Sequence, residues 1–221
     1  MPGDAHDRHP PRARARLAGL YAITPDALST ELLLEKVRLA IDGGARVVQY
    51  RNKTADQVTR LWQADALASM LKARDVLFIV NDSVELARAV KADGVHLGQA
   101  DGDIATARAA LPDKLIGVSC YNDLDRAIAA EKAGADYVAF GAAFPSATKP
   151  HAVRVPLALY REAARKLTIP VVAIGGINLH NARELVDAGV AAIAVVSALF
   201  DANDIAVTAR HFSDLFQKTK P

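Results

Sequence analysis

The strongest constraint on the fold is a regular alternation of short apolar runs with segments of helical periodicity. Continuous apolar runs of four to eight residues are typical of parallel strands that are buried on both faces. Such runs, separated by helices, predict a parallel sheet with its helices on the outside. Eight runs follow residue 16, at Leu17–Thr24, Arg46–Arg51, Val76–Asn81, Gly94–Gly98, Leu115–Cys120, Tyr137–Ala142, Pro170–Gly175 and Ala191–Ser197.

Helical patterns separate the apolar runs. A Thr54-x-x-Gln57 capping box predicts where the second helix begins, and Asn178 is a candidate cap near the C-terminal end of the chain. On the second helix, Leu61, Trp62 and Leu67 are expected to pack against the barrel. The predicted helices are Thr30–Ile41, Thr54–Lys72, Ser83–Lys91, Asp123–Ala133, Asn178–Ala188 and the short Ala198–Phe200.

A weak internal repeat supports the count of eight units. The order helix end, glycine, small residue and strand recurs at residues 40–48, 89–97, 131–138 and 186–193. Glycine after a helix permits the left-handed turn into the next strand. Eight βα units in about 200 residues predict an α/β chain with one domain, a (βα)8 TIM barrel over residues 17–221. A doubly wound open sheet is the alternative, but no glycine-rich dinucleotide fingerprint follows the first run.

Charge is concentrated at the N-terminus. The chain has 27 Lys and Arg against 25 Asp and Glu, and residues 1–16 hold four Arg and two Asp, which leaves 23 of each sign elsewhere (27 − 4 and 25 − 2). Residues 1–16 are rich in Pro and Arg and lack an apolar period, so we expect a disordered basic tail. A neutral body argues against nucleic acid as a partner.

Hydropathy and cysteine content narrow the class further. The chain is 51% hydrophobic, yet its apolar stretches are too short to span a membrane and its N-terminus lacks the apolar core of a signal peptide. A cytoplasmic protein without a membrane partner is therefore expected. Cys120 is the single cysteine, which excludes an internal disulfide, and we expect it to be a small packed side chain.

Two neighbouring runs end in carboxylates. Asp82 follows the third run and Asp101 follows the fourth, with the helix Ser83–Lys91 between them. A strand, a crossover helix and a parallel strand place both strand ends on one edge of the sheet, where catalytic residues of such barrels gather. Paired carboxylates there predict a hard cation such as Mg²⁺. The alternative is that both acids only cap the helices that follow them.

Other strand ends carry further polar groups. Gln49, Arg51 and Lys53 follow the second run, and the sequence places Asn81, His96, Gln99 and Ser119 at the next three strand ends. Two carboxylates with a cation, beside Arg and Lys, form an arrangement that suits a diphosphate. His96 could contact a ligand or could equally be a packed, supporting histidine.

Two later loops fit a second anion. Residues 143–155 form the longest connection after a strand and hold Ser146, Thr148 and Lys149, which indicates a lid or clamp, although Lys149 could be a solvated loop charge. Gly175-Gly176 and Val196-Ser197 follow the seventh and eighth runs, where many barrels bind phosphate. The alternative is that the glycines only ease packing.

Taken together, the order and spacing of these motifs resemble the thiamine phosphate synthase (thiamine-phosphate pyrophosphorylase) family, over nearly all of the chain after residue 16. Tyr50 stands where the family commonly has Leu or Phe, and Ser146 where Thr is common. The motifs are Gln49-Tyr50-Arg51-Asn52-Lys53, Val80-Asn81-Asp82, Gly94 to Asp101, Gly117-Val118-Ser119, Pro145-Ser146-Ala147-Thr148-Lys149, Gly175-Gly176-Ile177 and Val196-Ser197.

The resemblance implies a transferase that joins 4-amino-2-methyl-5-(diphosphooxymethyl)pyrimidine to 4-methyl-5-(2-phosphoethyl)thiazole, releasing diphosphate. It implies a dissociative mechanism, in which diphosphate leaves before the thiazole nitrogen attacks, so no general base is needed. By match, Asp82 and Asp101 would bind Mg²⁺, and Arg51, Lys53, Ser119 and Lys149 would be catalytic. The pyrimidine diphosphate would contact Gln49, Tyr50, Arg51, Asn52, Lys53, Asn81, Ser119 and Lys149, and the thiazole phosphate Ser146, Ala147, Thr148, Gly176, Val196 and Ser197.

Other functions stay open on the same barrel. A thiazole tautomerase-like isomerase would bind thiazole phosphate without Mg²⁺, and a non-catalytic barrel would bind a phosphorylated ligand without releasing diphosphate. A phosphosugar isomerase or aldolase would need a base inside the barrel, and only His96 is a candidate. We expect small-molecule substrates as partners, and homo-oligomerisation stays open.

Overall fold

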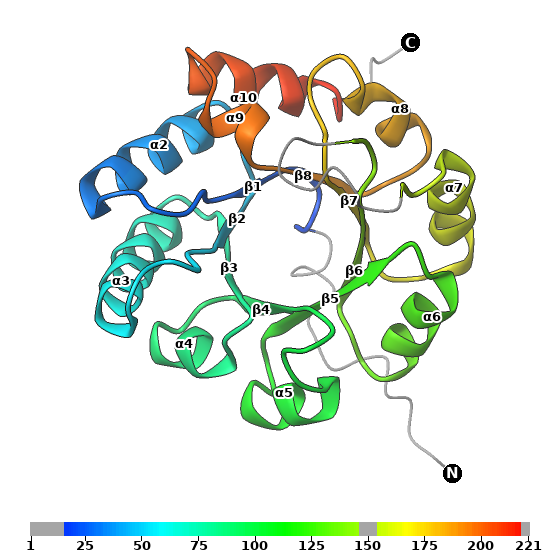
Figure 1. Cartoon of the computed structure of the whole chain (residues 1–221), viewed down its shortest axis with the longest axis horizontal. Helices are drawn as coiled ribbons and strands as arrows, with labels where there is room; N and C mark the ends of the chain where they lie inside the picture. The colour runs from blue at the N-terminus through cyan, green and yellow to red at the C-terminus, as the bar shows by residue number, and fades with distance from the viewer. Residues whose placement is uncertain (1–15, 146–153, 218–221) are drawn as a thin grey trace.

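The computed structural model describes residues 16–145 and 154–217 and confirms the predicted (βα)8 barrel. Eight parallel strands pair in chain order and β8 pairs with β1, which closes the ring (Figure 1). The strands are β1 (Gly19–Ile23), β2 (Val47–Tyr50), β3 (Leu77–Asn81), β4 (Gly94–Leu97), β5 (Leu115–Tyr121), β6 (Tyr137–Phe140), β7 (Val171–Ile174) and β8 (Ala192–Val195).

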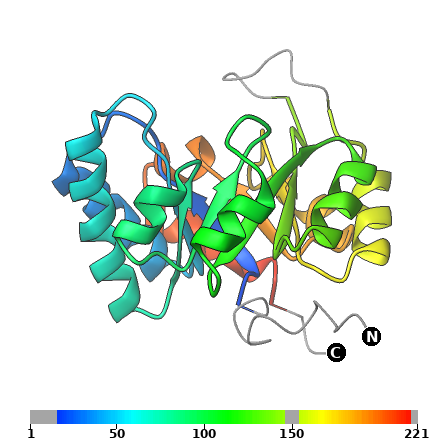
Figure 2. The same cartoon turned by 90° about the horizontal axis from the view of Figure 1, so that it is seen from below.

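Helices surround the ring of strands on its outside (Figures 1 and 2). Helices α5, α7 and α10 lie outside the ranges that were predicted from the sequence. The helices are α2 (Thr30–Asp42), α3 (Gln57–Ala73), α4 (Val84–Ala89), α5 (Ile104–Ala110), α6 (Leu124–Lys132), α7 (Leu157–Lys166), α8 (Ala182–Asp187), α9 (Ser197–Phe200) and α10 (Ile205–Asp214).

Several helix starts differ from the prediction. Helix α3 begins after Asp56, whose carboxylate accepts a hydrogen bond from the Thr59 amide, so the capping box expected at Thr54 is wrong. Helix α8 begins after Asn181 rather than at Asn178. In both places a polar residue further along the chain is the one that flanks the first helical turn, because the preceding residues form a loop that leaves the strand end.

The predicted packing of Trp62 is also wrong. The Trp62 side chain is 69% exposed and Leu61 is 46% exposed, whereas Leu67 is fully buried as expected. Helix α3 turns Gln63, Ala64 and Leu67 towards the barrel, and this orientation leaves Trp62 on its outer side.

The buried apolar residues form two separate clusters. The smaller one fills the inside of the barrel and includes Tyr21, Ile79 and Tyr137, while the larger one lies between the strands and the helices. Side chains of a strand alternate between these two layers. The inward positions that end β2, β3, β4 and β5 are therefore those of the polar residues Gln49, Asn81, His96 and Ser119.

Two findings bear on the ends of the chain and on membranes. Of the predicted basic tail, only Arg16 lies within the described residues, and its guanidinium is 2.7 Å from the Asp75 carboxylate. Among the residues described here, none of the helices is both long and apolar enough to cross a bilayer.

Candidate active site

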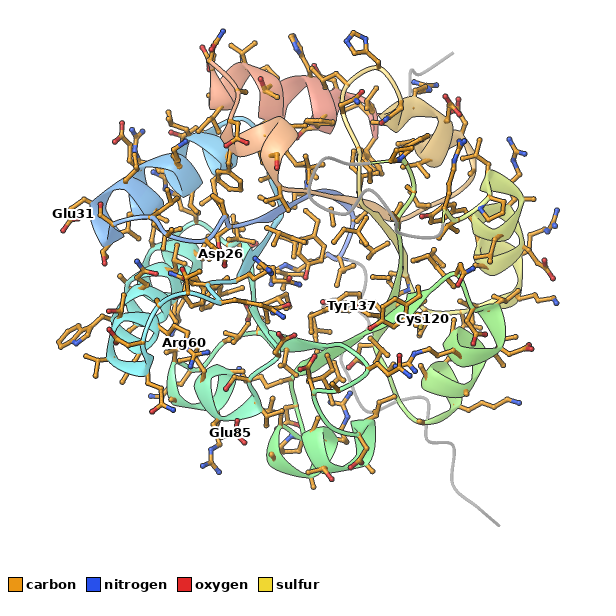
Figure 3. All side chains as sticks on the ribbon, viewed as in Figure 1. Asp26, Glu31, Arg60, Glu85, Cys120 and Tyr137 are labelled. Carbon is orange, nitrogen blue, oxygen red and sulfur yellow. The ribbon has the colours of Figure 1, made fainter. Side chains whose placement is uncertain are left out.

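The predicted site residues that the structure describes lie at or just after the C-terminal ends of the strands, on one face of the barrel. Residues 51–53, which we call the β2 arm, directly follow β2 and include Arg51 and Lys53. Thr24 and Asp26, which follow β1, hold the β2 arm by hydrogen bonds. The buried Thr24 hydroxyl donates to the Arg51 carbonyl (3.0 Å) and accepts from the Arg51 amide (2.9 Å). The Asp26 carboxylate binds the Arg51 guanidinium at 2.6 Å and accepts from the Lys53 amide at 2.7 Å. Asp26, labelled in Figure 3, thus fixes the arm and orients Arg51.

A buried glutamine on α3 supports the same arm from the helix side. Gln63 Oε1 accepts hydrogen bonds from the Tyr50 hydroxyl (2.9 Å) and from Asn52 Nδ2 (3.1 Å), and Gln63 Nε2 donates to the Leu28 carbonyl (2.9 Å). Asn52 Oδ1 in turn accepts from the Thr54 amide (3.2 Å). The side chains of Tyr50 and Asn52 are therefore engaged with α3 and do not face the mouth of the barrel.

Tyr50 has a strand position that explains this placement. It is adjacent to the inward residue Gln49 on β2, so its side chain points outward into the layer between the strands and the helices. Burial raises the pKa of Tyr50 to about 12 and keeps its hydroxyl protonated, as its donation to Gln63 requires. In the structure both side chains bind Gln63, and their contact with a substrate, which the resemblance implies, stays a prediction.

Asp82 lies at the end of β3 within reach of the β2 arm. Its carboxylate is 3.0 Å from the Lys53 ammonium. Asp82 has a positive φ of 63°. Apart from glycine, Asn and Asp are the residues that adopt this left-handed backbone conformation most readily. The cap of α4 is Ser83, whose hydroxyl accepts from the Leu86 amide at 3.1 Å. The alternative that Asp82 serves as the helix cap is therefore wrong.

After β4 as well, the acid at the strand end, Asp101, is not the residue that caps the next helix. The carboxylate of Asp103, not of Asp101, caps α5 by accepting from the Thr106 amide at 2.8 Å. Asp101 Oδ2 turns back to accept from the Gly98 amide at 2.8 Å. The other carboxylate oxygen of Asp101 accepts no hydrogen bond from the described residues. Both acids thus stand at adjacent strand ends without a role in starting a helix.

The donor set fits a hard cation with few protein ligands. Two carboxylates are the oxygen ligands that Mg²⁺ takes when water and phosphate oxygens complete its coordination. Within the described residues there is no group of three or more His, Cys, Asp or Glu side chains that could enclose a metal by themselves. Asp82 and Asp101 could therefore hold Mg²⁺ together with a phosphorylated substrate, and a closed structural metal site does not fit this part of the chain.

His96 and Ser119 meet inside the mouth of the barrel. His96 Nε2 lies 2.9 Å from Ser119 Oγ, and His96 Nδ1 lies 3.0 Å from the Tyr137 hydroxyl. Burial lowers the pKa of His96 to about 4, against a smaller opposing effect of the Asp101 charge, so the imidazole is neutral near pH 7. Of the two sequence-based alternatives, the structure favours a packed, supporting histidine.

The glycines after β7 make a close backbone approach. Gly176 has φ +66°, and a Cβ at this position would overlap the Phe144 carbonyl and lie 2.6 Å from the Pro145 carbonyl. The Phe144 amide donates to the Gly175 carbonyl at 3.0 Å. Gly176 is thus required for the contact between the β7 end and the loop after β6. Val196 precedes Ser197, the first residue of α9, at the end of β8.

Four predicted ligands, Ser146, Ala147, Thr148 and Lys149, lie outside the described residues, which include the loop after β6 only up to residue 145 and again from residue 154.

Cys120 is fully buried and burial raises its thiol pKa to about 12, which confirms a packed side chain. It is not poised as a nucleophile, because the thiolate is the reactive form.

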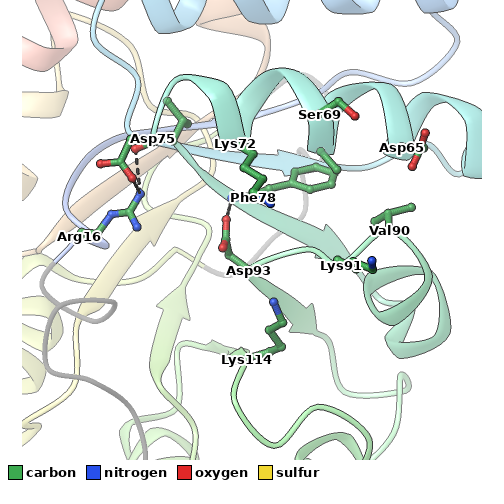
Figure 4. A pocket seen from close by; sticks show the side chains of 12 residues that line it. Arg16, Asp65, Ser69, Lys72, Asp75, Phe78, Val90, Lys91, Asp93 and Lys114 are labelled. Atoms are coloured by element: carbon green, nitrogen blue, oxygen red, sulfur yellow. Dashed lines mark hydrogen bonds and ion pairs between the residues drawn. The ribbon is translucent and has the colours of Figure 1, made fainter.

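A cavity of about 510 Å³ lies at the opposite face of the barrel, before β3 and β4 (Figure 4). Lys72, Lys91 and Lys114 line it together with Asp75 and Asp93. Helices α3 and α4 end beside this cavity, and the carbonyl groups at helix C-termini repel anions. The lysines offset these carbonyl and carboxylate charges, and the cavity is separate from the polar mouth.

Sequence reasoning missed Asp26 and Gln63. Asp26 follows the first strand, next to the basic residues that follow the second, and adjacent strands in chain order would have brought these opposite charges together. Gln63 gave no signal, because a glutamine on an amphipathic helix is expected to be exposed.

Comparison with known families fits this geometry. The family model described as "Thiamine monophosphate synthase" matches residues 20–199, which include every strand except the first residue of β1. The chain belongs to this family. The matched residues include the ends of β2, β3, β4 and β5 and the ends of β7 and β8. All of the candidate site residues therefore lie within the match to the thiamine monophosphate synthase family.

Individual relatives agree with the family assignment. The chain is 52% identical over 202 residues to a thiamine-phosphate synthase of Aromatoleum aromaticum, covering 91% of this chain and 97% of the relative. A thiamine-phosphate synthase of Chromobacterium violaceum is 53% identical with the same coverage. Among solved structures, thiamine phosphate pyrophosphorylase from Pyrococcus furiosus superposes with a TM-score of 0.83 at 39% identity, over 92% of this chain and 96% of that one.

Proposed function

We propose that this chain is a thiamine-phosphate synthase, a transferase that joins 4-amino-2-methyl-5-(diphosphooxymethyl)pyrimidine to 4-methyl-5-(2-phosphoethyl)thiazole and releases diphosphate. One observation carries the proposal. The cationic arm of Arg51 and Lys53 lies beside Asp82, and Asp101 follows the neighbouring strand. Basic side chains next to carboxylates that no helix requires form the arrangement expected for a diphosphate bound with a cation.

The basic residues would stabilise the leaving group. Arg51, held by Asp26, and Lys53 would donate charge-assisted hydrogen bonds to the diphosphate oxygens as negative charge develops on them. From the resemblance, Lys149 would add a third positive charge. No general base is needed when the leaving group departs first, and the neutral, packed His96 fits a site without one.

Asp82 and Asp101 would hold Mg²⁺. The ion would neutralise part of the diphosphate charge when bound. The Asp82 carboxylate lies 3.0 Å from the Lys53 ammonium, so the residue that would hold the cation is next to one that would hold the diphosphate.

Inward residues at the strand ends would orient the pyrimidine. Gln49, Asn81 and Ser119 occupy inward positions on β2, β3 and β5. Tyr50 and Asn52 would act through Gln63 by holding the arm. The thiazole phosphate would bind at Gly176, Val196 and Ser197, with the sequence-predicted Ser146, Ala147 and Thr148. Holding the nucleophile next to the departing group is a proximity effect, which can lower a barrier by several kcal/mol.

A thiazole tautomerase-like isomerase is the second candidate. It would have no use for a diphosphate or for a cation. The freedom of Asp82 and Asp101 from helix capping favours the synthase, because a site that binds only thiazole phosphate does not explain two carboxylates beside a cationic arm.

The test is diphosphate release by the purified protein with both substrates, in Mg²⁺ and then in EDTA. The proposal expects release that requires both substrates and the metal, with thiamine phosphate formed in equal amount. Release of no diphosphate, while thiazole phosphate still raises the melting temperature, would instead support the tautomerase or a non-catalytic binding barrel. The cytoplasmic location stays a prediction, and homo-oligomerisation stays open.

A further inference from the structure

Five polar side chains from five strands form one continuous hydrogen-bonded chain inside the barrel. Gln49 Nε2 donates to the Tyr21 hydroxyl at 2.8 Å, and the Tyr21 and Tyr137 hydroxyls are 2.9 Å apart. Tyr137 continues to His96 Nδ1 at 3.0 Å, and His96 Nε2 reaches Ser119 Oγ at 2.9 Å. The chain therefore joins two of the predicted pyrimidine ligands, Gln49 and Ser119, which stand at its ends. Tyr137 lies within the ring of strands (Figure 3).

The strands are built to make room for this chain. A Cβ at Gly117 would overlap the ring of Tyr137, its partner in the β5–β6 pairing. Because β5 has glycine at that inward position, the Tyr137 ring can cross β5 to reach His96 on β4. Tyr21, Tyr137 and Gln49 are each less than one-twentieth exposed, so bulk water does not compete for these hydrogen bonds.

The direction of the chain follows from counting its protons. The Gln49 amide nitrogen can only donate, so the Tyr21 oxygen accepts from it, and the Tyr137 oxygen is then the one acceptor that the described residues offer to the Tyr21 proton. The Tyr137 proton then has His96 Nδ1 as its partner. A neutral His96 that accepts at Nδ1 carries its own proton on Nε2 and donates it to Ser119 Oγ.

The consequence falls on Ser119. Its oxygen accepts from His96, so its own hydroxyl proton stays available for a group outside the chain. Burial lowers the pKa of His96 and raises that of Tyr137, which keeps both in the neutral forms that this chain needs. A reversed link would leave one hydroxyl proton of the chain without an acceptor among the described residues, because Gln49 Nε2 cannot accept.

We propose that Tyr21, Tyr137 and His96 are positioning residues that set the hydrogen-bonding sense of the chain, so that Ser119 donates to an acceptor atom of the pyrimidine substrate. The proposal rests on the function proposed above and deepens it. The sequence did not single out Tyr21 or Tyr137, and ligand contact was only one of two alternatives for His96. A chain that only satisfies buried polar groups would stabilise the core and would leave substrate recognition unchanged.

A double-mutant cycle separates the two roles. Tyr137→Phe keeps the ring and removes the hydroxyl, so we expect kcat/KM for the pyrimidine diphosphate to fall about tenfold, with KM for the thiazole phosphate unchanged. In a Ser119→Ala background the same substitution should change kcat/KM less than about twofold, because the group through which it acts is absent. An equal loss in both backgrounds would overturn the proposal.

Tyr160→Phe is the matched control. Tyr160 is also a buried tyrosine and donates to the Phe140 carbonyl at 3.0 Å, but it lies between the barrel and the helices, outside the chain. Its loss should lower stability by a similar amount and leave kcat/KM for the pyrimidine diphosphate unchanged. If Tyr160→Phe impaired that constant as much as Tyr137→Phe does, a general loss of stability would explain both.

Nitrogen-15 NMR of histidine-labelled protein tests the chain without any substrate. The wild type should show His96 as the neutral tautomer with its proton on Nε2, and Tyr137→Phe should shift it towards a mixture of tautomers. A wild-type proton on Nδ1 would overturn the proposal. The NMR measurement needs no enzymatic activity, so it tests the hydrogen-bonded chain even if the wild type forms no thiamine phosphate. A wild type that forms no thiamine phosphate would reject the proposed function and not the hydrogen-bonded chain.

Discussion

The Lys53 ammonium lies 3.0 Å from the Asp82 carboxylate, and these two residues come from the loops after β2 and β3. Both side chains are part-exposed, at 58% and 28%, and exposed ion pairs contribute little to stability. We therefore expect the Lys53–Asp82 ion pair to matter for ligand binding at the site and to add little to the free energy of unfolding. Under the proposed function, Lys53 would contact the diphosphate and Asp82 the cation, so the pair joins two neighbouring groups of the site.

Lys53→Met should separate activity from stability. We expect kcat to fall more than about tenfold, which corresponds to about 1.4 kcal/mol of transition-state stabilisation, while the free energy of unfolding changes by less than about 0.5 kcal/mol. Steady-state diphosphate release and urea denaturation measure the two quantities. A variant that turned over like the wild type would remove Lys53 from the leaving-group site.

Asp101→Asn and Asp103→Asn form a matched pair, two residues apart. Asp101→Asn should lower kcat more than about tenfold and raise the Mg²⁺ concentration needed for half-maximal rate, because a carboxylate ligand is lost. Asp103→Asn should keep near wild-type turnover, since asparagine also caps helices well. Mg²⁺ titration of diphosphate release gives both results, and equal behaviour of the two variants would argue against Asp101 as a metal ligand.

Gln63→Leu should weaken the arm from a distance. It leaves the Tyr50 hydroxyl and Asn52 Nδ2 without their acceptor, and a buried unsatisfied group costs about 1–3 kcal/mol. We expect that loss in thermal or urea unfolding, together with a lower kcat, because Arg51 and Lys53 are held less well. Gln57→Leu, at an exposed position of the same helix, should change neither quantity. A normal kcat in Gln63→Leu would show that the network supports only the fold.

Gly176→Ala and Gly134→Ala separate steric overlap from backbone strain. Both glycines have positive φ, but the added Cβ would overlap the Phe144 carbonyl at Gly176 and meet nothing within 4 Å at Gly134. Gly134→Ala should therefore destabilise by roughly 1–2 kcal/mol, the strain of a left-handed residue alone, and Gly176→Ala by more. KM for the thiazole phosphate should rise only in Gly176→Ala. Denaturation curves and substrate titrations check both.

Acidification should destabilise the protein through His96. Burial lowers its pKa in the folded state to about 4, from a value of 6.5 in the unfolded chain. Between these values the unfolded chain binds a proton that the folded protein does not. Stability is therefore fully present above pH 6.5 and falls by roughly 3 kcal/mol as the pH drops to 4. Urea titrations in Mg²⁺-free buffer should show this slope in the wild type and in the exposed control His211→Gln, and a smaller one in His96→Gln.

The barrel could be predicted from the sequence because eight strand-sized apolar runs alternate with helical segments, and four of the connections repeat the order helix end, glycine, small residue and strand. The strand ends then located Asp82, Asp101, Gln49 and Ser119 correctly, since all C-terminal strand ends meet at one face. Helix starts were harder, because a loop separates each strand from its helix and several polar residues in it can cap. The true caps, Ser83 and Asp103, follow the candidate ligands closely.

The pair Trp62 and Gln63 shows why the rest could not be predicted. Hydrophobicity favours a buried tryptophan and an exposed glutamine, and the structure has the reverse. The rotation of α3 is set by Ala64, Leu67 and Leu71, and Gln63 shares their side of the helix, where the hydroxyl of Tyr50 and the amide of Asn52 satisfy it. Partners that are distant in the sequence decide such a position, and one helical segment read alone does not contain them.

The separation of caps from strand-end acids has a consequence for how this barrel can diversify. Because Ser83 and Asp103 start α4 and α5 by themselves, Asp82 and Asp101 can be exchanged without the loss of a helix. The residues that start the helices and the proposed metal ligands are thus different residues, one or two positions apart. A descendant of this gene could acquire a new reaction at the mouth while every helix keeps its own starting signal.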